Sequence, residues 1–175
     1  MKLPAVIMAV LLIFGAIVLD SETQKDTEEE ILVVYYFGAT NIGFCVLPEN
    51  IAKIKEVKAD FQKKIKDYKI KFVMVCLDED IDEGLKFIKK YGFWDEISIG
   101  RSYHNELALF SLNKISTPEL PHIFVFKDRL SYGKWKLPVT KRRDLLVDLA
   151  GEKRIDEWIN KGYPVPYRND VLEED

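Results

Sequence analysis

Three runs of apolar residues stand out along the chain, separated by longer segments in which apolar and polar residues mix. Residues 31–37 read I-L-V-V-Y-Y-F, and residues 70–77 and 122–126 have a similar β-branched and aromatic character. Runs of this kind are typical of strands buried on both faces of a sheet. The sequence therefore predicts three buried strands.

The segments between these runs show the spacing of three and four that places apolar residues on one helical face. Between residues 45 and 68, this face contains Ile51, Ile54, Val57, Phe61, Ile65 and Tyr68. Pro48 falls in the first turn of this helix, where its missing N–H donor costs little. A second helix is expected between Asp78, as its N-cap, and Gly92. Its inner face contains Ile81, Leu85 and Ile88.

Weaker patterns fill the rest of the chain. Residues 96–100 are expected to form a short strand and residues 106–112 a short helix. Turn residues at 127–133 would lead to a second hairpin strand at 134–137, and a last helix is expected near residues 154–160. Strands that alternate with helices and end in a hairpin and a helix predict an α/β fold with a mixed central sheet flanked by helices.

Residues 1–30 have a different pattern. Lys2 precedes an almost unbroken apolar run over residues 3–19, and acidic residues dominate positions 20–30. A positive start followed by such a run is the pattern of an export signal. Because no small-residue cleavage site of the A-x-A kind ends the run, we favour an uncleaved membrane anchor with the acidic stretch outside the cytoplasm. A cleaved signal and a secreted product are the alternative. In both cases the expected location is extracytoplasmic, in the periplasm or at the cell surface.

The chain is expected to contain four parts. Residues 1–19 are the signal peptide or anchor, 20–30 an acidic tether, 31–136 a folded domain, and 137–175 a C-terminal helical extension with an acidic tail. With 175 residues, of which 47% are hydrophobic, the chain has apolar material for one compact domain with a sizeable core.

Charge and ligand spacing exclude several classes of function. The formal net charge of −3, from 26 basic and 29 acidic residues, gives no general electrostatic reason to expect nucleic-acid binding. Two cysteines, Cys45 and Cys76, and two histidines, His104 and His122, are not spaced as a metal-ligand set. The acidic run over residues 78–82 lacks the glycine and the bidentate glutamate of a calcium loop. We therefore expect neither a bound metal nor a cofactor.

The segment over residues 37–45, F-G-A-T-N-I-G-F-C, follows the first predicted strand and precedes the first predicted helix. It resembles the active-site turn of the thioredoxin superfamily, and in particular that of exported, membrane-tethered thiol-disulfide proteins of the TlpA and ResA type. In those proteins the turn usually reads F-x-A-[ST]-W-C-x-x-C. Asn41 stands in place of the tryptophan, Ile42 in place of the first cysteine and Phe44 in place of the frequent proline. Cys45 keeps the position of the second cysteine.

Two further segments support the resemblance. Residues 75–80, V-C-L-D-E-D, look like the end of the strand before the family's second core helix. Residues 117–126 look like the loop and strand that carry the family's cis-proline, which implies a cis bond between Leu120 and Pro121. The resemblance implies a thioredoxin-like three-layer fold for the domain at residues 31–136.

In the family, the first cysteine attacks a substrate disulfide and the second resolves the mixed disulfide. Replacement of the first cysteine by Ile42 implies a degenerate redox site. The leading hypothesis is that the protein binds or assists protein or peptide segments of exported proteins. The binding surface that the resemblance implies contains Ile42, Gly43, Phe44, Leu120 and Pro121.

An enzymatic alternative stays open. Cys45 could act as a monothiol disulfide oxidoreductase, with His122 as the base that generates its thiolate. Cys45 could instead be an inert core residue, or form a disulfide with Cys76 if their Cα atoms lie within about 7 Å. His122 could equally be a satisfied polar residue at the start of a strand.

Overall fold

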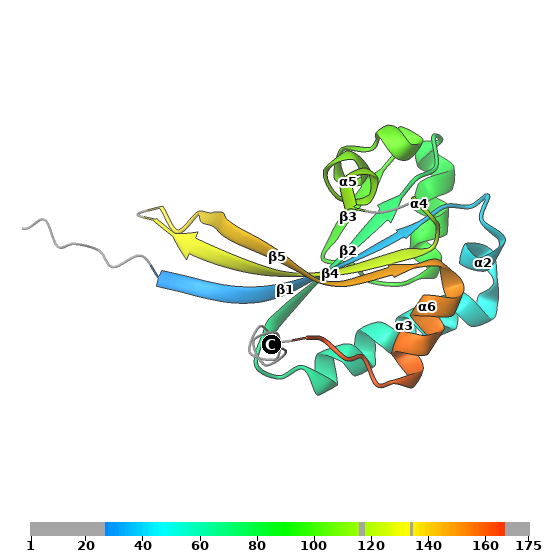
Figure 1. Ribbon diagram of the computed structural model, residues 1–175. Helices are drawn as coiled ribbons and strands as arrows, with labels where there is room; N and C mark the ends of the chain where they lie inside the picture. Colours follow the sequence, from blue (N-terminus) through cyan, green and yellow to red (C-terminus); the bar gives the residue numbers. More distant parts are fainter. Residues whose placement is uncertain (1–26, 116–117, 134, 167–175) are drawn as a thin grey trace, which may run out of the picture.

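The computed structural model describes residues 27–115, 118–133 and 135–166. At its centre is a five-stranded mixed sheet with the strand order β3-β2-β1-β4-β5 (Figure 1). The strands are β1 (Thr27–Gly38), β2 (Lys69–Cys76), β3 (Glu96–Ile99), β4 (His122–Tyr132) and β5 (Pro138–Ala150). β1 pairs in parallel with β2, and β2 with β3, whereas β4 runs antiparallel to both β1 and β5.

The helical elements connect the strands and follow the last one. They are α2 (Gly43–Val46), α3 (Pro48–Lys64), α4 (Ile81–Lys90), the 3-10 turn η1 (Ser102–His104), the π-helical turn η2 (Ala108–Leu112), α5 (Asn113–Ile115) and α6 (Gly151–Asn160). In Figure 1, α3 and α6 lie on one side of the sheet and α5 on the other. The predicted three-layer α/β architecture, in which helices flank a mixed central sheet on both sides, is confirmed.

Both faces of the central strands are buried, as the apolar run in β1 predicted. Successive side chains of a strand point to opposite faces, so β1 contributes to two separate apolar clusters. The large core contains Val34 and Tyr36 of β1 together with Phe61 of α3, Phe87 of α4 and Ile155 of α6. The small core contains Tyr35 and Phe37 of β1 together with Ala108 and Leu112 of η2.

The single helix expected between residues 45 and 68 is two helices. Leu47 has extended backbone angles, with φ −68° and ψ 131°, and separates α2 from α3. Because a proline ring disfavours helical angles at the preceding residue, Pro48 begins a new helix instead of continuing the first. α3 ends at Lys64, and its buried face contains Ile51, Ile54, Val57 and Phe61, as the spacing predicted.

α4 begins later than expected. Its N-cap is Asp80, whose carboxylate accepts hydrogen bonds from two backbone N–H groups of the first turn, at 2.8 and 3.0 Å. Asp78 is therefore not the cap. Phe87 and Ile88 are buried, whereas Ile81, which was expected on the inner face, is 58% exposed.

The β4–β5 hairpin is the largest departure from the sequence prediction. Residues 127–132, expected to belong to a turn, continue β4. Residues 135–137, expected to belong to the second hairpin strand, instead precede β5, which begins at Pro138. The polar segment that follows is strand β5 instead of the start of a helical extension. The sheet therefore continues past residue 136, where the folded domain was expected to end.

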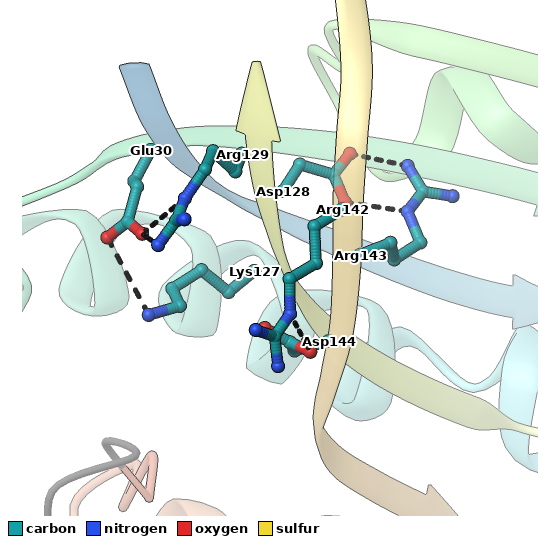
Figure 2. Close-up of polar contacts among 7 residues, drawn as sticks. All are labelled: Glu30, Lys127, Asp128, Arg129, Arg142, Arg143 and Asp144. Carbon is teal, nitrogen blue, oxygen red and sulfur yellow. Dashed lines mark hydrogen bonds and ion pairs between the residues drawn. The ribbon is translucent and has the colours of Figure 1, made fainter. Parts of the chain in front are cut away.

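Ion pairs between neighbouring strands explain why charged segments form this part of the sheet. Glu30 of β1 contacts Lys127 and Arg129 of β4, and Asp128 of β4 contacts Arg143 of β5 (Figure 2). These partners are far apart in the sequence, so the local pattern does not reveal them. For the same reason β1 begins at Thr27, inside the expected acidic tether.

Several predicted segments lie outside the described residues: the signal peptide or anchor over 1–19, residues 20–26 of the tether, and residues 167–175 of the acidic tail. Within the described ranges, no helix has both the length and the apolar character needed to span a bilayer. The last predicted helix is present as α6.

Candidate functional site

The turn that resembles a thioredoxin active site lies between β1 and α2, at the carboxyl ends of the parallel strands β1 and β2. Asp78, which follows β2, holds this turn in place. The Thr40 backbone N–H donates to Asp78 Oδ1 at 3.0 Å, and the Thr40 hydroxyl donates to the same oxygen at 2.7 Å. The Cys76 thiol donates to Asp78 Oδ2 at 3.0 Å. The Asp78 carboxylate thus ties the turn to the end of β2.

Sequence reasoning missed this role of Asp78, because it assigned the residue to a helix cap. A topological signal was present in the sequence. The carboxyl ends of neighbouring parallel strands lie at the same edge of a sheet, so a carboxylate after β2 lies near the turn after β1.

Ile42 and Cys45, at the positions of the two family cysteines, have opposite environments. Ile42 is the N-cap residue of α2 and is partly exposed, whereas Cys45 lies within α2 and is 0% exposed. Burial raises the pKa of the Cys45 thiol, because a thiolate in this place would lose its hydration. The cysteine of the turn is therefore a protonated thiol without contact to solvent.

Two tyrosines contact Cys45. The Tyr91 hydroxyl donates to the Cys45 carbonyl oxygen at 2.6 Å, and the Tyr36 hydroxyl lies 3.7 Å from Cys45 Sγ and 3.1 Å from the Tyr91 hydroxyl. Burial raises the pKa of both phenols, which keeps them protonated near neutral pH. Neither phenol can accept the thiol proton. The hydrogen bond from the Tyr36 hydroxyl lowers the pKa of Cys45, but burial acts more strongly in the opposite direction and the pKa stays raised.

His122 is associated with the opposite face of the sheet. Its ring centroid lies 4.4 Å from that of Phe124, which belongs to the small core, whereas Cys45 belongs to the large core. His122 Nε2 is 2.7 Å from Asp148 Oδ1, and Nδ1 is 3.2 Å from the Glu119 carbonyl oxygen. Both ring nitrogens contact oxygen atoms, and the side chain is 0% exposed, so His122 is a buried residue whose polar partners are Glu119 and Asp148, not Cys45.

Cys76 is a core thiol in β2. Both cysteines are free, so no disulfide joins Cys45 to Cys76. Burial raises the pKa of Cys76 to about 12, and its hydrogen bond to the Asp78 carboxylate acts in the same direction. Among residues 27–115, 118–133 and 135–166, no cluster of three or more His, Cys, Asp or Glu side chains is placed to hold a metal ion.

The loop before β4 forms the second part of the candidate site. Its Leu120–Pro121 peptide bond is cis, as the resemblance implied. Leu120 and Ile42 both pack against the small core, so the loop and the turn meet at one apolar cluster. Within the described part of the chain, the Leu120 backbone N–H and C=O make no hydrogen bond. They are therefore available to pair with an extended peptide.

The five predicted binding residues differ in exposure. Gly43 is exposed, Ile42, Phe44 and Leu120 are partly exposed, and Pro121 is buried. The Pro121 carbonyl is also occupied, because it accepts a hydrogen bond from the backbone N–H that begins α6, at 2.9 Å. We call Ile42, Gly43, Phe44 and Leu120 the docking surface. Pro121 positions Leu120 and does not itself face solvent.

Comparison with known proteins gives matches at the level of three-dimensional structure. No family model matches the sequence, and no curated protein matches it. A thiol-disulfide oxidoreductase from Bacteroides fragilis is 17% identical with a TM-score of 0.41, over 75% of this chain and 80% of that one. The thioredoxin domain of a thiol-disulfide oxidoreductase from Bacteroides vulgatus is 12% identical with a TM-score of 0.44, over 77% and 80%. An uncharacterized thioredoxin-like protein from Porphyromonas gingivalis is 19% identical with a TM-score of 0.40, over 75% and 73%. Similarity at this level assigns no role to individual residues.

Proposed function

We propose that this thioredoxin-fold protein acts outside the cytoplasm and binds extended segments of exported proteins at its docking surface, without thiol exchange by Cys45. The observation that carries the proposal is the contrast within the turn. The partly exposed position holds the unreactive side chain of Ile42, while the thiol of Cys45 is completely buried. Thiol-disulfide exchange requires a thiolate that can reach the substrate sulfur, and Cys45 meets neither condition.

The loop before β4 supports a binding role that needs no thiol. Leu120 presents a backbone N–H and C=O without hydrogen bonds within the described residues, and it packs against the same apolar cluster as the partly exposed side chain of Ile42. Backbone groups of this kind pair with an extended chain in any sequence, and adjacent apolar side chains add contact area. A surface so built favours unfolded or extended segments over folded ones.

The extracytoplasmic location rests on the pattern of residues 1–30, in which a basic start, an apolar run and an acidic stretch follow one another. This pattern supports a membrane anchor that leaves the thioredoxin-like domain on the outer side. Exported proteins are then the polypeptides that the docking surface meets.

Glycine substitutions test the docking surface without disturbing the fold. A Cβ on Gly43 or on Gly133 would have no atom within 4 Å, and neither residue has a positive φ. Gly43→Trp fills the docking surface, whereas Gly133→Trp places the same side chain in the β4–β5 turn. With a permanently unfolded, alkylated polypeptide as the probe, we expect Gly43→Trp to weaken binding about tenfold, which corresponds to about 1.4 kcal/mol.

The matched variant Gly133→Trp is expected to bind the unfolded probe as the unmodified protein does. Isothermal titration or fluorescence anisotropy of a labelled probe measures both affinities. Equal binding by the two variants would show that the docking surface is not the binding site.

A further inference from the structure

The turn between β4 and β5 exposes apolar side chains at the end of the sheet opposite to the docking surface. Trp135 is 80% exposed, Leu137 67% and Val139 53%. The turn is closed by a hydrogen bond from the Lys136 backbone N–H to the Gly133 carbonyl oxygen, at 2.8 Å. We call Trp135, Lys136, Leu137 and Val139 the hairpin tip. In Figure 1, β1, β4 and β5 project beyond the helices at this end of the molecule.

The described chain begins beside the hairpin tip. Thr27 is the register partner of Tyr132, and Tyr132 is in turn the partner of Pro138, which follows the turn. The apolar run over residues 3–19 therefore connects to the folded domain at this end. Only residues 20–26 intervene, and seven residues span at most about 25 Å even when fully extended. If the run lies in a bilayer, the hairpin tip lies near the surface of that bilayer.

The charges around the hairpin tip are compatible with a lipid surface. Among the described residues of these strands, Glu29 pairs with Lys69. Figure 2 shows the other ion pairs: Glu30 with Lys127 and Arg129, Asp128 with Arg143, and Asp144 with Arg142. Within the described residues, Lys136 and Lys141 form no ion pair, and both are exposed. In β1, Glu28 is exposed and likewise forms no ion pair within the described residues. The unpaired charges of these three residues are therefore two positive and one negative.

The residue types of the tip match those of a membrane interface. Tryptophan combines a large apolar ring with an N–H donor and is enriched at the level of lipid headgroups. Lysine beside it extends its ammonium group toward phosphate while its carbon chain covers apolar surface. We propose that the hairpin tip docks into the headgroup region of the bilayer that holds residues 3–19. This inference rests on the membrane anchor in the proposed function, and it adds a second contact that orients the domain.

Tryptophan fluorescence tests this contact directly, because Trp94 and Trp158 are buried whereas Trp135 is exposed. The full chain is reconstituted into vesicles of phosphatidylcholine and phosphatidylglycerol whose lipids are brominated near the headgroup. We expect bromine to quench most of the Trp135 emission, and Trp135→Phe to remove this quenching. Phe110, which is 66% exposed on η2, provides the control. In the Trp135→Phe background, Phe110→Trp is expected to remain unquenched.

The other outcomes separate the hairpin contact from the anchor. Sedimentation of the chain with vesicles, without quenching of Trp135, overturns the hairpin contact and leaves the anchor intact. Equal quenching of Trp135 and of a tryptophan at position 110 indicates unspecific adsorption and also overturns the contact. Failure to sediment with vesicles overturns both the anchor and the hairpin contact. Binding of the unfolded probe in solution remains a separate measurement of the docking surface.

Discussion

Burial controls the chemistry of both thiols in this protein. Cys45 and Cys76 are 0% exposed, and loss of hydration raises the pKa of each thiol. A helix N-terminus normally lowers a thiol pKa, but this effect requires the sulfur to lie at the exposed start of the helix. Ile42 occupies that start, and Cys45 lies behind it in the large core.

The raised pKa of Cys76 predicts a loss of stability at alkaline pH. The folded state holds the thiol proton up to about pH 12, whereas an ordinary thiol loses it near pH 9.0. Between these values the folded protein binds more protons than the unfolded chain, so the stabilisation is complete below the lower pKa and is lost as pH rises. We expect the free energy of unfolding, measured with urea at each pH, to fall more steeply for the unmodified protein than for Cys76→Ser.

Serine at position 76 keeps a hydrogen-bond donor for Asp78 but does not ionise in this range. Burial is the largest cause of the raised pKa values of Cys45, Tyr36 and Tyr91, and it acts in both proteins, so the difference between the two curves comes mainly from Cys76. Parallel curves for the two proteins would contradict the assignment to Cys76.

At the scale of elements, the β4–β5 hairpin depends on an ion pair between a buried carboxylate, Asp128, and a guanidinium that is 41% exposed, Arg143. The Arg143 guanidinium donates to both carboxylate oxygens of Asp128, each at 2.6 Å, and Asp128 is 3% exposed. The guanidinium carbon also lies 5.2 Å from the centroid of the Phe126 ring and 5.7 Å from that of Tyr35. This pair joins β5 to the small core and holds a charged strand in the sheet.

Removal of Arg143 is expected to destabilise the protein strongly, because it leaves the buried Asp128 carboxylate without its partner. Arg143→Ala should cost about 2 kcal/mol in the free energy of unfolding, because Asp128 is buried although Arg143 itself is 41% exposed. In the neighbouring pair the carboxylate of Asp144 is 29% exposed and water can replace its partner, so Arg142→Ala should cost less than about 1 kcal/mol. Urea unfolding of both variants measures the difference in the free energy of unfolding. Similar costs for the two substitutions would contradict a structural role of the Asp128–Arg143 pair.

The sequence predicted those elements whose stability comes from their own apolar pattern. The core of β1, β2 and the buried face of α3 follow directly from apolar runs and helical spacing. β5 could not be predicted in this way, because its strand state depends on partners in β4. The cis bond before Pro121 was accessible through the family resemblance. The separation of His122 from Cys45 could not be predicted from the sequence, because it depends on which face of β4 the His122 ring occupies.

At the scale of the whole molecule, β1 connects the two sites that we propose. Its start, at Thr27, lies beside the hairpin tip, and its end, at Gly38, leads into the turn that carries the docking surface. Twelve residues of strand place these ends about 36 Å apart, at a rise of about 3.3 Å per residue. A domain held at the membrane by its hairpin tip would therefore present the docking surface away from the bilayer, where exported chains can reach it.

The central claim is that the docking surface works without a reactive thiol, and alkylation of the native protein tests it most directly. The full chain is treated with iodoacetamide near neutral pH, and intact mass is measured before and after unfolding in urea. Because Cys45 and Cys76 are buried and protonated, we expect no adduct in the folded state and two adducts after unfolding. Rapid modification of Cys45 in the folded protein would contradict this account and support the monothiol enzyme instead.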